Sequence, residues 1–193
     1  MVRHACDVLH GRGYERALTG ALAERERSGF LSAGFEPHEQ LHLLAHDLQD
    51  LPDAPNVRLR RGWLPDRDAA LAVDSAAFPA FWRLDKAGLR EAIDATPVAR
   101  FRVGTDGGAV VGYTVTGRAG TRGYVQRVAV HPDHAGRGFG RALVLDGLRW
   151  LRTRKADQAV VNTQAGNERA LDLYQRLGFR LQPSGLLVLA VAL

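Results

Sequence analysis

The hydrophobic and polar positions of residues 57–193 alternate between the two-residue period of strands and the longer period of helices. In the stretch after Gly138, Leu143, Gly147, Trp150 and Leu151 share one face at helical spacing. Strands are predicted at 57–61, 99–104, 109–116, 123–130, 158–163 and at the C-terminal end of 179–193. Helices are predicted at 64–73, 86–95, 138–154 and 167–177. This mixture predicts an α/β (α+β) domain over residues 55–193.

The first 54 residues follow a less regular pattern. A short helical start precedes a polar helix at about 23–33 and an apolar strand at 40–48. The stretch 51–56 has two prolines and no periodicity, which indicates a linker. The chain is therefore predicted to carry a small N-terminal αβ segment over residues 1–54. Because the strand at 40–48 is too apolar to stay exposed, it is expected to dock against the core sheet.

Composition narrows the class of protein. The 193 residues carry a net charge of +5, supplied almost wholly by scattered arginines, which does not predict nucleic-acid binding. Cys6 is the single cysteine, so no internal disulfide can form and a reducing compartment is expected. No stretch resembles a leader or a membrane span, so a cytoplasmic protein without membrane contact is predicted.

Three histidines, His38, His42 and His46, recur every four residues. On a helix this spacing could bind a metal ion. The leucines around them favour a strand, which would hold the three imidazoles too far apart to converge. No metal site is predicted.

The stretch 123–143 has the strongest chemical signal in the chain. An apolar strand ends at His131-Pro132, and Gly136, Gly138 and Gly140 follow at the start of a helix. Glycines allow a tight turn and a close backbone approach, and the first helical N–H groups have no partner within the helix. This loop, residues 131–140, is called the glycine loop below. It is predicted to bind a phosphate, although an ordinary glycine turn is the structural alternative.

Two common phosphate-binding loops are excluded by spacing. The dinucleotide pattern requires a third glycine where Arg141 stands, and the P-loop requires Gly-Lys-Ser/Thr, which is absent. The remaining pattern is Arg/Gln-x-x-Gly-x-Gly/Ala after a strand. It resembles the acetyl-CoA loop of the GCN5-related N-acetyltransferases, the GNAT family, with Gly138 and Gly140 as its glycines. Ala135 replaces the leading Arg/Gln and removes one side-chain donor.

A second motif strengthens the resemblance. Asn167-x-x-Ala-x-x-x-Tyr-x-x-x-Gly-Phe179 is similar to the family's next helix, and the predicted order of elements from Val57 to Leu193 is the GNAT order. The resemblance implies a GNAT fold, in which helices flank a mixed, mostly antiparallel central sheet. It also implies acetyl-CoA (coenzyme A) as cofactor.

The resemblance assigns roles residue by residue. The implied cofactor-binding residues are Val128, Ala129, Val130, Gly136, Arg137, Gly138, Phe139, Gly140, Arg141 and Asn167. An amide near Val128 would polarise the thioester, and Tyr174 would protonate the departing sulfur. Tyr174 could instead be a core aromatic residue, and capping alone could explain Asn167.

The acceptor side is less well defined. The implied substrate-binding residues are Phe81, Trp82, Tyr124 and Gln126. Phe78 could join the two aromatics in a wall for the substrate, although all three aromatics of the 76–83 loop could simply pack into the core. Some family members carry a glutamate base where Tyr124 stands. The general base is therefore unassigned: a water chain, an unprotonated amine and His131 are the candidates.

Two functions follow from these assignments. The first is an acyltransferase that moves the acetyl group of acetyl-CoA to a primary amine of a small molecule or a peptide, with a homodimer as one candidate assembly. The second is a GNAT-shaped sensor or scaffold that binds acyl-CoA without turnover. Ala135 and the missing glutamate motivate the second function.

The N-terminal segment repeats part of the C-terminal sequence at a constant offset of 144. Gly34 and Phe35 correspond to Gly178 and Phe179, and Phe30 corresponds to Tyr174. The segment is therefore predicted to be a degenerate partial GNAT repeat. It has no counterpart of the glycine loop and should not bind the cofactor by the same device.

Overall fold

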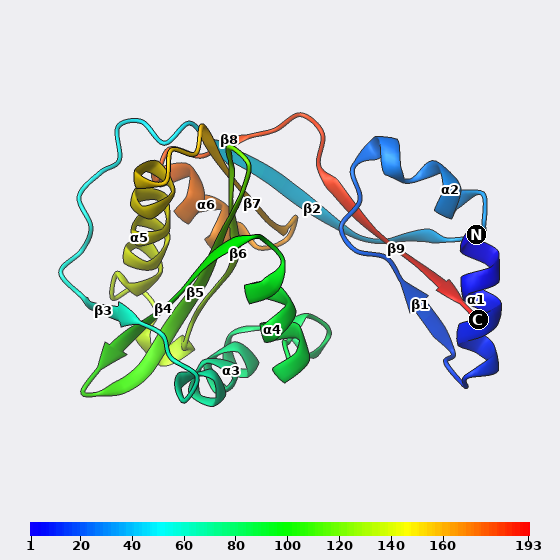
Figure 1. Ribbon diagram of the computed structural model, residues 1–193, viewed down its shortest axis with the longest axis horizontal. Coiled ribbons are helices and arrows are strands. Elements are labelled where there is room, and N and C mark those ends of the chain that lie inside the picture. Colours follow the sequence, from blue (N-terminus) through cyan, green and yellow to red (C-terminus); the bar gives the residue numbers. More distant parts are fainter. The chain divides into compact units, whose positions relative to one another are not determined.

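The computed structural model describes residues 1–193, which divide into two compact units (Figure 1). Unit 1 consists of Met1–Leu44, Asn162–Asp172 and Arg180–Leu193, and unit 2 consists of Ala45–Val161 and Leu173–Phe179. The units thus interleave along the chain. Unit 1 combines N-terminal residues with two later segments of the chain, and the domain boundary at residue 54 stays a prediction.

Unit 2 contains a five-stranded sheet in the order β7-β6-β5-β4-β3. Its pairs are antiparallel except β6–β7, which is parallel. The strands are β3 (Arg58–Arg61), β4 (Val98–Asp106), β5 (Ala109–Ala119), β6 (Arg122–Val130) and β7 (Gln158–Gln164), the last of which ends in unit 1. A mixed, mostly antiparallel sheet with flanking helices confirms the predicted fold class.

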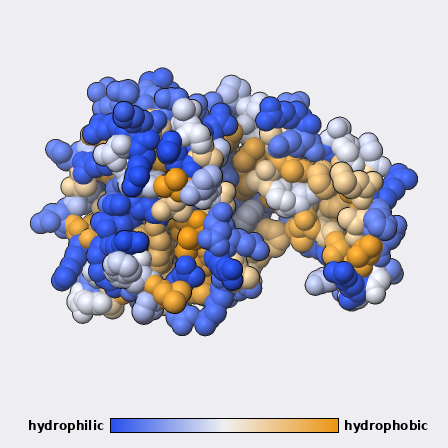
Figure 2. All heavy atoms as spheres, viewed as in Figure 1, coloured by the Kyte–Doolittle hydropathy of each residue, from blue (hydrophilic) through white to orange (hydrophobic).

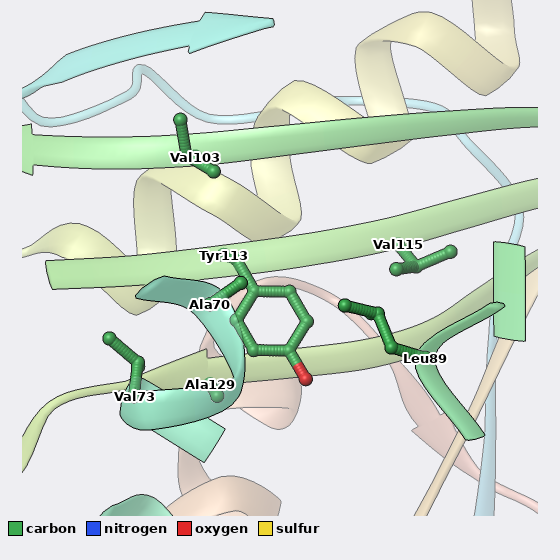
Figure 3. Close-up of a cluster of buried hydrophobic side chains, with 7 residues drawn as sticks. All are labelled: Ala70, Val73, Leu89, Val103, Tyr113, Val115 and Ala129. Carbon is green, nitrogen blue, oxygen red and sulfur yellow. The ribbon is translucent and has the colours of Figure 1, made fainter. Parts of the chain in front are cut away.

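Helices cover both faces of this sheet. Tyr113 and Val115 of β5 point toward α3 and α4, where they join a buried apolar cluster with Leu89 (Figure 3). Gly112 and Gly147 mark the opposite face, because there β5 and α5 approach closely. The helices are α3 (Asp66–Ala77), α4 (Lys86–Asp94), α5 (Phe139–Thr153) and α6 (Glu168–Arg176), with a short 3-10 turn at Ala80–Trp82.

Unit 1 is built on a three-stranded antiparallel arrangement in the order β1-β9-β2. The strand predicted at 40–48 overlaps β2, which pairs with β9. This pairing agrees with the expectation that the apolar strand docks against a sheet. The predicted helix at 23–33 is wrong in one respect: two short pieces replace it. The elements are α1 (Val2–Gly11), β1 (Arg16–Leu18), a 3-10 turn (Glu24–Glu26), α2 (Ser28–Leu31), β2 (Glu36–His46), β8 (Arg180–Leu181) and β9 (Leu186–Ala192).

The surface of unit 1 has several exposed apolar side chains, and Figure 2 shows apolar residues on the part that carries both chain ends. The exposed large apolar residues of this unit are Met1, Val8, Tyr14, Leu18, Leu31 and Leu181. None of the helices combines the length and the apolar character that crossing a membrane would require.

Deleting residues 1–54 is expected to lower solubility sharply. The deletion removes both strands that flank β9, whose Val188 and Leu189 are buried, and an uncovered apolar strand promotes aggregation. Deleting residues 1–12 is the matched control, because α1 has no buried residue. Soluble yield and sedimentation would be compared, and a soluble, monodisperse chain lacking residues 1–54 would contradict the expectation.

Candidate active site

The glycine loop joins β6 to α5 by a turn that only glycine adopts easily. Gly136 and Gly138 have φ values of 76° and 87°, in the left-handed region. Gly138 caps α5, and its carbonyl accepts the N–H of Ala142 at 3.0 Å. The amides of the first turn after Gly138 therefore have no earlier carbonyl within the helix to bond. Together with the helix dipole, they form a site suited to an anion.

Both arginines of this region already have partners within the protein. Arg137 pairs with Asp106 at 2.8 Å, and Arg141 donates a hydrogen bond to the carbonyl of Asp53 at 3.2 Å. Pro55 packs so closely on Gly138 that a Cβ there would lie 2.9 Å from the proline Cβ. The linker thus lies against the glycine loop. An anion bound here would rely mainly on backbone N–H groups, with the arginines adding charge from the rim.

Strand β6 directs part of its backbone away from β5. Thr114 on β5 donates its hydroxyl to the carbonyl of Arg127 at 2.9 Å, so this carbonyl points toward β5. The N–H of a trans peptide points opposite to its C=O, so the Val128 N–H points away from β5. The N–H of His131 bonds to Val111 on β5. By strand alternation, Val130 also directs its backbone groups away from β5.

Pairing between β6 and β7 stops before these residues. The parallel register joins Arg122–Tyr124 to Gln158–Val160 and extends no further along β6. A bulge at Gln126, where Val125 and Arg127 face consecutive residues of β5, bends the strand at the same point. An extended ligand can therefore pair with the backbone groups of Val128 and Val130, as a further strand would.

Two of the predicted cofactor-binding residues lie with their side chains in the core. Ala129 is 3% exposed and lies in the cluster under α3. Backbone groups along β6 point alternately toward and away from β5, and those of Val128 and Val130 point away, so the backbone groups of Ala129 point toward β5. Phe139 is 5% exposed and packs against Gly104 and His134. Ala129 is therefore poorly placed for ligand contact, whereas Phe139 offers its backbone N–H alone.

The helix α6 presents the predicted acid and the predicted cap. The side-chain oxygen of Asn167 accepts the N–H of Ala170 at 3.1 Å, which confirms that Asn167 caps α6. Tyr174 is 6% exposed and packs edge to face on Phe179, with 5.5 Å between ring centroids. Burial raises the pKa of the Tyr174 hydroxyl to about 12, against a smaller lowering by the guanidinium of Arg127. The phenol is therefore a neutral proton donor at ordinary pH.

The predicted acceptor residues lie on two separate elements. Phe81 and Trp82 belong to the 3-10 turn after α3, with ring centroids 5.0 Å apart and edge-to-face packing. Phe81 is 48% exposed, so it does not pack into the core, whereas Phe78 is partly buried and packs against the core cluster, as the alternative interpretation expected. Tyr124 and Gln126 lie on β6, and the buried side-chain oxygen of Gln126 has no hydrogen-bond partner.

A buried ion pair next to these residues was not predicted from the sequence. Asp74 on α3 is completely buried, and its carboxylate accepts two hydrogen bonds from Arg127 on β6, at 2.7 and 2.8 Å. The Tyr113 hydroxyl and the Leu84 N–H donate to the same carboxylate, at 2.5 and 2.8 Å. Asp74 shares one face of α3 with the apolar residues Ala70, Val73 and Ala77. A carboxylate on an apolar helix face is unusual, and this signal in the sequence could have predicted a buried, paired Asp74.

The sequence of this chain matches a known protein family over the region that contains the glycine loop and α6. Residues 68–179, more than half of the chain, match the family model described as the acetyltransferase (GNAT) family. The chain belongs to the GNAT family. The resemblance inferred from the glycine loop and the Asn167–Phe179 motif is thereby confirmed, and acetyl-CoA is the acyl donor of GNAT acetyltransferases.

Some curated proteins are similar to this chain over more than the region that matches the family model. Mycothiol acetyltransferases from Pseudarthrobacter chlorophenolicus and Amycolatopsis mediterranei are 34% and 32% identical over 87% of this chain. The alignments cover 58% and 67% of those proteins, so the chain spans about three fifths of the length of these curated relatives. A tandem GNAT protein from the clavulanic acid biosynthesis pathway shares the fold, with a TM-score of 0.72 at 15% identity, over 98% of this chain and 68% of that one.

Proposed function

We propose that this GNAT chain is an N-acetyltransferase that moves an acetyl group from acetyl-CoA to a primary amine. The observation that carries the proposal is the unpaired backbone of Val128 and Val130, which leads directly into the glycine loop. The extended arm of a ligand could pair with the backbone of β6, and a diphosphate at the end of that arm would then reach the N–H groups at the start of α5. The family assignment supports the same donor.

The residues present fit this cofactor. Val128 and Val130 would hold its extended arm, and the amides from Gly136 to Arg141 would hold its diphosphate, with Arg137 on the rim. Asn167 caps α6. When bound, acetyl-CoA supplies the acetyl group as a thioester.

The chain's own groups provide two of the three functions that acyl transfer needs. The Val128 N–H donates a hydrogen bond to an acyl oxygen that gains negative charge. The Tyr174 hydroxyl holds the proton that a departing thiolate takes. With Tyr124 and Gln126 on β6 in place of a carboxylate, the acceptor amine arrives unprotonated, or it loses its proton to a water chain or to His131.

The acceptor is an amine of a small molecule or a peptide, and Phe81, Trp82, Tyr124 and Gln126 are proposed to line its side of the site. The names of the mycothiol acetyltransferases add the unacetylated amine form of mycothiol to the candidates. We place the protein in the cytoplasm, which agrees with its single cysteine.

The test is thiol release from acetyl-CoA in the presence of a panel of small amines, amino sugars and peptides, together with calorimetry of coenzyme A. Amine-dependent thiol release and an acetylated product are expected. Coenzyme A binding without transfer to any amine would favour the sensor function, and the absence of coenzyme A binding would overturn the proposal.

Replacing Ala135 by glutamine is expected to tighten coenzyme A binding by about two- to five-fold. The substitution restores a donor at the first position of the loop motif, and an exposed donor to an anion contributes about 0.3–1 kcal/mol. Calorimetry of the variant and the parent would measure the change. Unchanged affinity would place the position 135 side chain away from the diphosphate.

We also propose that the N-terminal segment, residues 1–54, contains a degenerate partial GNAT repeat. The two segments end their helices alike: the N–H of Phe35 bonds to Phe30, and that of Phe179 bonds to Tyr174, after glycines that both have a φ of 93°. The ring pairs Phe30–Phe35 and Tyr174–Phe179 have centroid distances of 5.3 and 5.5 Å. These correspondences support the repeat at the offset of 144.

A further inference from the structure

We propose that Asp74 and Arg127 are positioning residues, which hold the Val128 amide and the aromatic turn Ala80–Trp82 in a fixed relation. The inference rests on the proposed acetyltransferase function. It assigns the buried pair a part in aligning the acyl group with the acceptor. Neither residue is proposed to touch the reacting atoms.

Arg127 is held on every side. Its guanidinium makes the paired hydrogen bonds to Asp74 and lies 3.6 Å from the ring centroid of Phe78. Its carbonyl is held from β5 by the Thr114 hydroxyl. Because the side chain and the carbonyl of one residue are both fixed, the peptide plane that carries the Val128 N–H has little freedom to rotate.

The bulge makes this restraint necessary. Gln126 is the extra residue of β6, directly before Arg127, and it interrupts the regular ladder with β5. On its other side β6 has no β7 partner beyond Tyr124. The ladder alone therefore restrains this part of β6 less than it restrains a central strand, and the ion pair with α3 supplies a further anchor.

The same pair closes the aromatic turn onto the sheet. The Arg127 Nη2 donates to the carbonyl of Trp82 at 2.7 Å, and the Asp74 carboxylate accepts the N–H of Leu84 at 2.8 Å. The turn that carries Phe81 and Trp82 is thus fastened at two backbone positions. One ion pair links the proposed oxyanion donor to the proposed acceptor wall.

Stability alone does not account for an ion pair at this place. Apolar side chains of similar volume often replace a buried ion pair without loss of stability, because the desolvation of both charges offsets their attraction. Here the pair lies beside an apolar cluster that could have continued through it. Its directional bonds to two backbone groups, the Trp82 carbonyl and the Leu84 N–H, in contrast, have no apolar substitute.

The test compares Arg127→Lys with Arg100→Lys. Lysine keeps the charge but loses the planar fork, so it cannot bond to Asp74 and Trp82 in the same way. Arg100 is the matched control, because it makes a similar paired contact with Asp146, at 2.9 and 3.2 Å, on the α5 face. For Arg127→Lys, kcat/KM for the amine is expected to fall about 10- to 100-fold, as for a misplacement of about 1 Å. The Kd of coenzyme A should change less than three-fold.

The double variant Asp74→Asn with Arg127→Gln guards against misfolding, because it leaves no unpaired charge in the core. In ligand-free protein, the amide signals of Val128 and Trp82 should shift and their hydrogen exchange should accelerate in both Arg127 variants but not in Arg100→Lys. This measurement can be made even if the parent protein transfers no acetyl group. A failure of the proposed function can therefore be distinguished from a failure of the positioning role. Equal losses for Arg127→Lys and Arg100→Lys, or unmoved Val128 and Trp82 amides, would overturn the proposal.

Discussion

Replacing Tyr174 by phenylalanine is expected to lower kcat for acetyl transfer by about 10²- to 10⁴-fold, the range typical of a lost general acid. The hydroxyl is the single group removed, while the ring keeps its edge-to-face contact with Phe179. Binding of coenzyme A should therefore stay within about two-fold of the parent value. Steady-state thiol release with the best acceptor amine, together with calorimetry, measures both quantities.

The pH profile provides a check on this role. A phenol donates its proton only while protonated, and burial raises the pKa of Tyr174 to about 12. Loss of activity at high pH should therefore not set in near pH 10, the ordinary value for tyrosine. Equal kcat for the parent and the phenylalanine variant would show that Tyr174 is a core aromatic residue and no acid.

Replacing Gly138 by alanine is expected to weaken coenzyme A binding by at least ten-fold. A left-handed conformation costs other residues roughly 1–2 kcal/mol, and the new Cβ would lie 2.9 Å from the Cβ of Pro55. The backbone must shift where the amides of the glycine loop converge. Calorimetry with coenzyme A measures the loss.

Gly120→Ala is the matched control for backbone strain. Gly120 also has a positive φ, 58°, but a Cβ there would meet nothing within 4 Å, and it lies in the turn between β5 and β6. Both variants should lose thermal stability, whereas Gly138→Ala alone should lose affinity. Undiminished affinity in Gly138→Ala would mean that the loop does not hold the diphosphate.

Much of unit 2 could be predicted because its signals are local. Alternating apolar residues predicted β3 and β6. Asp106-Gly107-Gly108 is likewise a local hairpin signal between β4 and β5, where both glycines have positive φ. The glycine loop was readable for the same reason, since its glycines and the helix that follows are neighbours in sequence. Asn167 was readable as a cap three residues before the N–H that it accepts.

The N-terminal segment was harder to read, because pairing between distant residues decides its structure. The polar stretch at 23–33 breaks into two short pieces, and β2 begins at Glu36, in a stretch that is more polar than the predicted strand. Its partner is β9, which lies about 150 residues later in the chain. No local pattern carries that information.

The amino-acid sequence by itself determined the GNAT family, the acyl donor expected for it, and the residues of the loop, the cap and the candidate acid. Only the tertiary structure decided which backbone groups of β6 stay unpaired, which side chains enter the core, and that Asp74 and Arg127 meet. The reason is physical. A turn or a cap depends on residues a few positions apart, whereas a buried carboxylate is stable only next to donors that folding brings from three other segments.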